Sequence, residues 1–374
     1  MIYLDNAASS APSELMLENQ IDWLTRFYAN PDATHEAGYQ SMLAVQRAEL
    51  LVNKLTGATG LAKIIWTGTA TEAINIAITG YCSNFKDGEI VTTNIEHKAV
   101  LEPAHRSHLS TRSLPLTKEG IIDVEAAHTV LSKNTRMIAI HHINNETGVI
   151  QPIAELAKVR DQICPKAIIM LDAAQSFGKI PINWQTLGID MLVATAHKIH
   201  GINGTAILQY NQDLKLTANT FGGGQQENLR SGTLNVAGIV AFSEAFKLAC
   251  TELKEVSERI TSINQYTRRE LTRTYGKRIH FHASEALSDP HILSFALEGY
   301  QGAILMRGLG AEGIIIGTGS ACLAEVNSAS HVMTELGVAK HLAFSTLRVS
   351  FGRQNKMSDA KLFLELLEKV VADY

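Results

Sequence analysis

The sequence predicts an α/β protein with a large, doubly wound and mainly parallel sheet and a second, smaller α+β domain. Short apolar runs alternate with helix-like segments from about residue 60 to 210. A long helical pattern follows near residues 237–275, and strand-like and helix-like stretches then alternate irregularly toward the end. The first pattern is typical of parallel sheets with helices on both faces. The length of 374 residues suits two domains at roughly 150 residues each.

The apolar runs of the first region are predicted to form strands. Several are almost continuously apolar, as expected for strands that are buried on both faces of a parallel sheet. Segments such as residues 152–162 fit the crossover helices between them. The predicted strands cover residues 63–66, 89–93, 136–141, 167–171, 191–195 and 205–208.

The long helical pattern is predicted to join the two domains. Leu253, Val256 and Ile260 lie on one face of a helix, and Gly276 is a natural stop. The predicted boundary near residue 250 gives a large domain of residues 13–250 and a small domain of residues 1–12 and 251–374. The small domain is expected to have strands over residues 291–296, 313–316 and 346–351, and helices over residues 301–309 and 359–372.

Composition excludes several classes of protein. Lys and Arg number 33 against 37 for Asp and Glu, so the chain lacks the basic excess of a nucleic-acid-binding protein. The four cysteines show no zinc-finger spacing, and we expect reduced thiols, no metal site and no disulfide framework. No signal peptide or membrane-spanning run is evident, so we expect a soluble cytoplasmic protein.

Ligands of open α/β sheets bind beyond the carboxyl ends of the strands, so the residues that follow each run matter most. Residues 67–72 read Thr-Gly-Thr-Ala-Thr-Glu and follow the first predicted strand. Small residues let backbone N–H groups approach an anion, and a helix start adds the attraction of its dipole. The hydroxyl of Thr71 could add a donor. Taken alone, the segment also fits an ordinary turn that a threonine caps.

Two charged residues follow later strands. Asp172 comes directly after the run 167–171, and Lys198 comes soon after the run 191–195. A buried carboxylate needs a cationic or N–H partner, such as a protonated ring nitrogen. A lysine at this place shifts its pKa readily, as a lysine that forms a Schiff base must. The ordinary alternatives are a helix-capping aspartate and a lysine that extends into solvent.

Other candidates come from loops and from the small domain. His97 and Asn145 follow two further strands and could stack on a flat ring or supply an amide. Cys322 ends the segment 317–322, Gly-Thr-Gly-Ser-Ala-Cys, and a Gly/Ser-rich loop suits a reactive thiol. The forked guanidinium of Arg348 suits a carboxylate. Each has a purely structural alternative, but together they predict one site with an anion cradle, a base and a thiol.

These segments, in this order, resemble the cysteine desulfurases, which are fold-type I, class V aminotransferase-like enzymes that depend on pyridoxal phosphate. The resemblance covers nearly the whole chain. The His-Lys, Arg-Ser-Gly-Thr and Gly-Ser-Ala-Cys segments at 197–198, 230–233 and 319–322 are the most specific. The other matching segments are residues 3–8, 30–31, 96–100, 144–149, 172–176 and 347–352.

The resemblance implies roles around the cofactor ring. Lys198 would form the Schiff base with the cofactor, Asp172 would pair with the ring nitrogen, and His97 would stack on the ring and assist proton transfers. Gln175 would contact the phenolate oxygen, and Asn145 would lie near both cofactor and substrate.

The resemblance also implies roles for the phosphate, the substrate and the sulfur atom. Thr233 would reach the phosphate of a neighbouring subunit, which implies a homodimer. Arg348 would bind the substrate carboxylate, and Cys322 would be the nucleophile. Within one subunit, the phosphate would be held by Ala70, Thr71, Thr195 and His197.

The activity implied by the resemblance is the removal of sulfur from L-cysteine. Lys198 would take the Cα proton as general base, and the products would be L-alanine and a persulfide on Cys322. The sulfur would pass to an acceptor, as in iron–sulfur cluster assembly. Residues 323–330 resemble the longer loop of the subgroup that delivers sulfur directly to scaffold proteins.

The chain departs from the family pattern at several places. Thr69 replaces a glycine of the cradle, and Ile202-Asn203 lies where the family often has Pro-Lys. Gln225-Gln226-Glu227 stands where the family has Gln-Glu-Arg, and Leu323-Ala324 where it has Thr-Ser. These departures leave the sulfur acceptor open. The alternatives are a selenocysteine lyase, a kynureninase-like or aminotransferase-like enzyme, or a catalytically idle scaffold protein.

Overall fold

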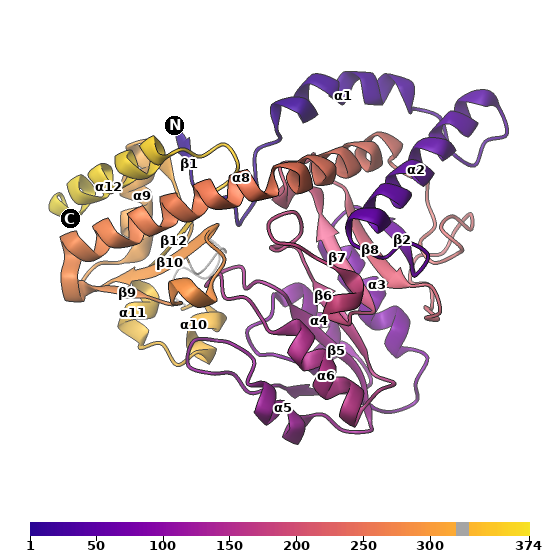
Figure 1. The fold of residues 1–374 in the computed structure, drawn as a ribbon, viewed down its shortest axis with the longest axis horizontal. Helices are drawn as coiled ribbons and strands as arrows, with labels where there is room; N and C mark the ends of the chain where they lie inside the picture. The colour runs from indigo at the N-terminus through magenta and orange to yellow at the C-terminus, as the bar shows by residue number, and fades with distance from the viewer. Residues whose placement is uncertain (319–328) are drawn as a thin grey trace.

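The computed structural model of the chain describes residues 1–318 and 329–374. Cys322 and the following Leu323-Ala324 lie outside the described residues. Figure 1 shows two groups of elements joined by one long helix, α8, with both chain termini in the same group.

The larger group is built on a seven-stranded sheet with the order β2-β8-β7-β6-β5-β3-β4. Only β8 runs antiparallel to the other six strands of this sheet, so the prediction of a mainly parallel sheet is confirmed. The strands are β2 (Ala62–Thr67), β3 (Glu89–Thr92), β4 (Ser110–Ser113), β5 (Thr135–His141), β6 (Ile168–Asp172), β7 (Met191–Thr195) and β8 (Ala206–Asn211).

Strand β4 was not predicted from the sequence. Its four residues, Ser-Thr-Arg-Ser, are all polar and at least partly exposed, and it pairs only with β3 at the edge of the sheet. A strand of this kind has no apolar run, because backbone pairing alone holds it in place.

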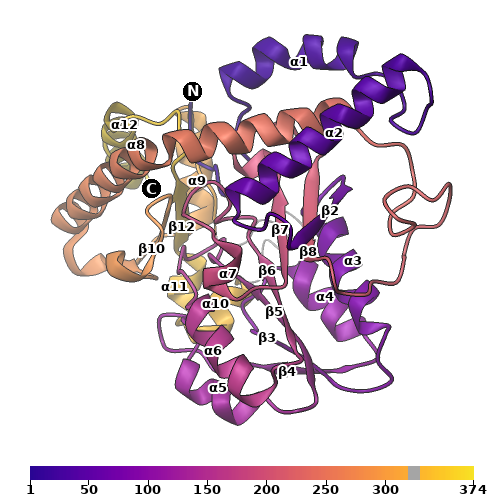
Figure 2. The ribbon, with the colours of Figure 1, turned by 45° about the vertical axis from the view of Figure 1, so that its right-hand side comes forward.

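Helices cover both faces of this sheet. Figure 2 shows α3 and α4 together on one side of the strands, where Ile65, Ile90 and Val193 pack against them. The other face packs against residues of α2, α6 and α8. The helices around the sheet are α1 (Glu14–Arg26), α2 (Glu36–Leu55), α3 (Ala70–Cys82), α4 (Lys98–Arg106), α5 (Val124–Val130), α6 (Ile153–Ile163), α7 (Trp184–Leu187) and the 3₁₀ turn η1 (Ala196–Lys198).

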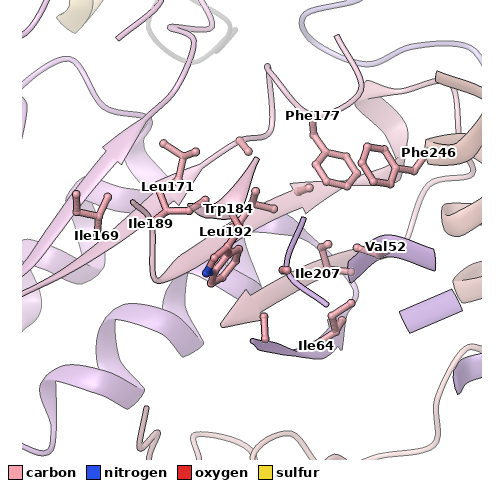
Figure 3. Packing of buried hydrophobic residues seen from close by; sticks show 14 of the residues in the cluster. Val52, Ile64, Ile169, Leu171, Phe177, Trp184, Ile189, Leu192, Ile207 and Phe246 are labelled. Atoms are coloured by element: carbon pink, nitrogen blue, oxygen red, sulfur yellow. The ribbon is translucent and has the colours of Figure 1, made fainter. Parts of the chain in front are cut away.

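The packing beneath α8 fixes the turn that follows β6. Figure 3 shows Ile169 and Leu171 of β6 in the same apolar cluster as Phe177 and Phe246. The rings of Phe177 and Phe246 stack with their centroids 3.7 Å apart. Because close-packed interiors resist displacement, this contact anchors the residues between Asp172 and Phe177 to α8.

The smaller group contains a three-stranded antiparallel sheet of order β12-β10-β9 and a parallel pair of β1 with β11. Its strands are β1 (Ile2–Tyr3), β9 (Ile279–Phe281), β10 (Ile292–Leu297), β11 (Ile314–Ile315) and β12 (Thr346–Ser350). Its helices are α9 (Gly302–Ala311), α10 (His331–Glu335), α11 (Lys340–Phe344), α12 (Met357–Ala372) and the 3₁₀ turns η2 (Gly276–Arg278) and η3 (Glu285–Leu287).

Helix α8 (Val236–Tyr275) passes through both groups. Its residues Phe242 and Phe246 belong to the core of the large sheet, whereas Ile260 and Leu271 belong to the core of the small group. Gly276 ends the helix at a φ of 54°, which glycine adopts without strain. The division into domains at residue 250 stays a prediction, since one continuous helix crosses that point.

No helix in the described part of the chain is long and apolar enough to cross a lipid bilayer.

Candidate active site

A cavity of about 400 Å³ lies at the carboxyl ends of the strands of the large sheet. Among its lining residues are ten of the twelve predicted site residues: Ala70, Thr71, His97, Asn145, Asp172, Gln175, Thr195, His197, Lys198 and Arg348. The structure of the single chain does not bring Thr233, which is exposed, to this cavity. The remaining predicted residue, Cys322, lies outside the described residues.

The anion cradle is the start of helix α3, immediately after β2. The side chain of Thr69 caps this helix by accepting a hydrogen bond from the N–H of Glu72, at 3.1 Å. The Glu72 carboxylate in turn accepts a hydrogen bond from Gly68 N–H, at 2.7 Å, and pairs with Arg230, at 2.8 Å. The unusual Thr69 therefore stabilises the cradle as a helix cap, and the N–H groups of Ala70 and Thr71 lie at the positive end of the helix.

Lys198 lies in η1, at the end of β7, with its amine in the cavity. Its Nζ donates to the carbonyl oxygens of Ala7 and Ala8, the latter at 2.8 Å. Burial, together with the nearby charges of Lys179 and Arg348, lowers the pKa of Lys198 to about 7. Near pH 7 the Lys198 amine is therefore neutral in a substantial fraction of the molecules.

Asp172 is the last residue of β6 and is buried. Its Oδ1 accepts a hydrogen bond from the N–H of Ala174, at 2.9 Å. Burial raises the pKa of the Asp172 carboxyl. A buried carboxylate that lines a cavity gains most from a cation or an N–H donor placed in that cavity.

His97 caps the start of helix α4. Its Nδ1 accepts a hydrogen bond from the N–H of Ala99, at 3.1 Å. A backbone N–H is always a donor, so the proton of the neutral imidazole lies on Nε2. Burial lowers the pKa of His97, and the neutral ring is the favoured form.

His197 and Thr195 bring further polar groups to the cavity. Burial, with the charges of Lys198 and Lys179, lowers the pKa of His197 to about 4. The ring is therefore neutral near pH 7, and its Nδ1 lies 3.3 Å from the hydroxyl of Ser9. The hydroxyl of Thr195 donates to the carbonyl of Thr205, at 3.4 Å.

The small group contributes Arg348 of β12 to the opposite side of the cavity. Its guanidinium donates to the carbonyl of Asn145, at 2.9 Å, and pairs with the carboxylate of Asp5, at 2.8 Å. Gly317 pairs with Arg348 through backbone hydrogen bonds. A Cβ atom at position 317 would lie 2.8 Å from Asp5 Oδ1, so only glycine leaves room for this ion pair.

Glu146 connects the large sheet to the start of α10. The hydroxyl of Ser330 donates to Glu146 Oε2, at 2.5 Å. Burial raises the pKa of Glu146 to about 7, although the Ser330 hydrogen bond and the charge of Arg348 oppose the shift. This contact fixes the chain directly after the segment that contains Cys322.

Several residues of the site were not predicted from the sequence. The carbonyls of Ala7 and Ala8 hold Lys198, and His141 lines the cavity, with its Nδ1 2.8 Å from the carboxylate of Glu96. His141 ends a predicted strand, so its position past an apolar run was an available signal. The carbonyls of residues 7 and 8 have no such signal, because backbone atoms are the same in every residue.

Among residues 1–318 and 329–374, no group of three or more His, Cys, Asp or Glu side chains is arranged to hold a metal ion.

The family of class-V aminotransferases matches residues 2–363 of the chain. The cysteine desulfurase IscS of Dictyoglomus turgidum is 32% identical over 99% of this chain and 94% of its own length. The resemblance to cysteine desulfurases that the motifs indicate is therefore confirmed over the full length.

Two solved structures are similar over nearly the whole fold. A protein described as NifS-like has a TM-score of 0.92 and 28% identity, and the match covers 100% of both chains. The structure of SspA in complex with cysteine has a TM-score of 0.81 and 27% identity, and covers 94% of this chain and 99% of its own.

Proposed function

The chain belongs to the aminotransferase class-V family, and on this premise we propose that it is a cysteine desulfurase that depends on pyridoxal phosphate. The observation that carries the proposal is the cavity in which the Lys198 amine, the Asp172 carboxylate and the start of α3 come together. The relative from Dictyoglomus turgidum is named a cysteine desulfurase, and SspA was solved with cysteine. Both support L-cysteine as the substrate.

The residues of the cavity fit each chemical feature of pyridoxal phosphate. The start of α3 suits the phosphate, Asp172 suits the protonated ring nitrogen, and the partly neutral amine of Lys198 suits the aldehyde. A volume of about 400 Å³ is in the usual range for a cofactor site. The cofactor supplies an electron sink that stabilises negative charge at the substrate Cα.

Lys198 is the proposed general base. Because burial and the neighbouring cations favour its neutral form, it accepts a proton from the substrate Cα near pH 7. The carbonyls of Ala7 and Ala8 accept hydrogen bonds from its amine and hold the side chain in the cavity. The neutral imidazole of His97 has its proton on Nε2, from which it can be donated.

Arg348 is the proposed binding group for the carboxylate of L-cysteine. Its side chain is buried, and its Nε has no hydrogen-bond partner among the described residues. An unpaired buried donor costs free energy, so a carboxylate that reaches the guanidinium is favoured. Asp5 holds the same guanidinium in place from the other side.

Cys322 is the proposed nucleophile, on the sequence evidence alone. Its thiolate would attack the sulfur atom of the substrate, and the Cβ–S bond would break with its electron pair remaining on the carbon side. Protonation at Cβ and return of a proton to Cα would then complete L-alanine. The sulfur would remain on Cys322 as a persulfide and pass to an acceptor protein. This chemistry needs a reduced thiol, so cytoplasmic location stays part of the proposal.

Thr233 is proposed to act across a homodimer. It is exposed in the single chain, and Arg230 in the same segment is fixed by its ion pair with Glu72 of the cradle. Both features are compatible with Thr233 reaching the phosphate of a second subunit. Light scattering should give the mass of a dimer, and a fully active monomer would contradict this part of the proposal.

The decisive experiment uses the chain purified with pyridoxal phosphate, L-cysteine and a thiol reductant, with alanine and sulfide measured together. We expect equal amounts of both products. Cys322→Ala should keep the visible absorption of the cofactor and lose sulfide release. Cys250→Ala is the matched control, because burial raises the pKa of that half-buried thiol to about 11 and makes it unreactive.

Other outcomes separate the alternatives. Release of selenide from selenocysteine without sulfide from cysteine would favour a selenocysteine lyase. Undiminished sulfide release by Cys322→Ala would refute the persulfide role. A chain that binds no pyridoxal phosphate would favour an idle scaffold protein.

A further inference from the structure

A second lysine, Lys179, is connected to Lys198 by a short hydrogen-bonded path. Lys179 Nζ donates to Gln175 Oε1, at 3.2 Å, and Gln175 Nε2 donates to the carbonyl of Ala7, at 2.8 Å. Lys198 Nζ donates to the same carbonyl and to that of Ala8. The carbonyl of Ala7 accepts only, so the amide nitrogen of Gln175 must face it and the amide oxygen must face Lys179.

The two lysines also line one small cavity on the side of η1 that faces α8. This cavity, of about 40 Å³, lies against an apolar part of α8 that includes Ala245 and Leu248. Its volume holds about three water molecules. In a space this small the charge of Lys179 is poorly screened, so it acts on the Lys198 amine.

Asp289 and Arg348, which act on the pKa of Lys179, come from the small group. His197, Lys198 and His200, on which Lys179 acts, lie in or directly after η1. Asp289 lies between η3 and β10, and its Oδ1 accepts hydrogen bonds from His291. Its Oδ2 is buried and has no hydrogen-bond partner among the described residues. Burial lowers the pKa of Lys179 to about 8, the charge of Asp289 opposes this shift, and the charge of Arg348 adds to it.

The charged groups that face Lys198 are of both signs. Lys179 and Arg348 disfavour its ammonium form, whereas Asp172 and Asp5 favour it. Of these four, Lys179 has the largest effect on the pKa of Lys198 after burial itself. Asp172 and Arg348 have roles of their own in the proposed reaction, whereas Lys179 lines only the small cavity.

We propose that Lys179 is a positioning residue for Lys198: it fixes the place of the Lys198 amine through Gln175 and Ala7, and its positive charge keeps that amine neutral. The neutral form is the one that accepts a proton from Cα. The negative charge of Asp289 favours the ammonium form of Lys179, so the small group takes part in setting the charge that acts on the base. The inference deepens the proposed function, since Lys198 is the base proposed there.

The test measures the Lys198 amine directly, in the chain without cofactor. Lysines are dimethylated with ¹³C-formaldehyde, which leaves their charge, and the Lys198 signal is assigned by its loss in Lys198→Arg. In Lys179→Met the midpoint of the Lys198 titration should rise by about one pH unit. Lys179→Arg should keep the original midpoint, because it keeps the charge. Lys63→Met, on the edge strand β2, is the matched control, because Lys63 pairs with Glu227 outside both cavities.

An unchanged Lys198 midpoint in Lys179→Met would overturn the inference. Circular dichroism checks that the variant is folded, and Lys179→Gln replaces it if it is not. In the complete enzyme, the acid limb of the pH profile of kcat, which reports the enzyme–substrate complex, should move upward by a similar amount. If the midpoint of the Lys198 titration shifts but the enzyme releases no sulfide, the proposed function is refuted and the positioning role stands. If sulfide is released but neither the Lys198 midpoint nor the acid limb of the pH profile shifts, the positioning role alone is refuted.

Discussion

The two sides of the cavity are built in different ways. The side from the large sheet consists of residues at the ends of neighbouring strands, such as Asp172 and Thr195, with the start of α3 beside them. The side from the small group depends on single long-range contacts: Arg348 with Asp5, Arg348 with Asn145, and Ser330 with Glu146.

This difference separates two tasks. The strand ends are fixed by the hydrogen bonds and the packing of an entire sheet, which suits residues that must hold a rigid cofactor. The contacts of the small group involve one or two side chains each, so they are easier to break and re-form. We expect changes on the sheet side to remove the cofactor and changes on the other side to affect the substrate or the adjoining segment.

The largest effect is expected for Lys198→Ala. The variant should lose the visible absorption of the bound cofactor and lower the rate of sulfide release by roughly four orders of magnitude, because the general base is gone. Absorption spectra and product assays measure the two effects. Lys63→Ala is the control, and a Lys198→Ala protein that keeps a borohydride-reducible band would contradict the assignment.

Replacement of Arg348 should show most clearly that the side from the small group affects substrate binding and not cofactor binding. Arg348→Met should keep the cofactor absorption and raise KM for L-cysteine by roughly ten- to a hundredfold, since a charged hydrogen bond is lost. Steady-state kinetics measure KM. Arg353→Met is the control, because that guanidinium pairs with Glu252 instead. If Arg348→Met lost the cofactor and kept its KM for L-cysteine, Arg348 would serve the cofactor and not the substrate, which contradicts the division of tasks between the two sides.

Glu146 should make the junction with α10 dependent on pH. Its pKa is about 7 in the folded protein against an ordinary value of 4.5, so stability falls as the pH rises between these values. Glu146→Gln keeps an acceptor for Ser330 and removes the ionisation. Its free energy of unfolding relative to the wild type should therefore increase by about 3 kcal/mol between pH 4.5 and pH 8.

Urea unfolding at several pH values measures this difference. The exposed Glu102→Gln on α4 is the matched control. Parallel pH curves for the wild type and Glu146→Gln would show that Glu146 is not buried as described.

The smallest effect is expected at the cap of α3. Thr69→Ala removes the acceptor for Glu72 N–H and should cost about 1 kcal/mol of stability. Thr69→Ser keeps the hydroxyl and should restore most of it, and Thr69→Gly should cost only a few tenths of a kcal/mol. Equal stability of the alanine and serine variants in urea unfolding would show that the cap contributes nothing.

The sequence by itself determined the sheet side of the site. Parallel strands buried on both faces produce long apolar runs, and their carboxyl ends meet at one edge, so the residues that follow the runs were predicted to converge. Asp172, His97 and Lys198 line one cavity in the structure, and their roles there stay predictions. For Arg348 the residue type suggested a carboxylate ligand but left a surface ion pair open, and the order of the motifs favoured the first.

Only the tertiary structure decided how these groups are held and charged. The carbonyls of Ala7 and Ala8 reach Lys198 across more than half the chain, and no side-chain pattern encodes a backbone contact of that kind. The pKa of Lys198 depends on burial and on Lys179, whose position comes from the turn after β6 and its packing against α8. Residue types can be read from a sequence, but the electric field at an amine depends on distances that exist only in the folded chain.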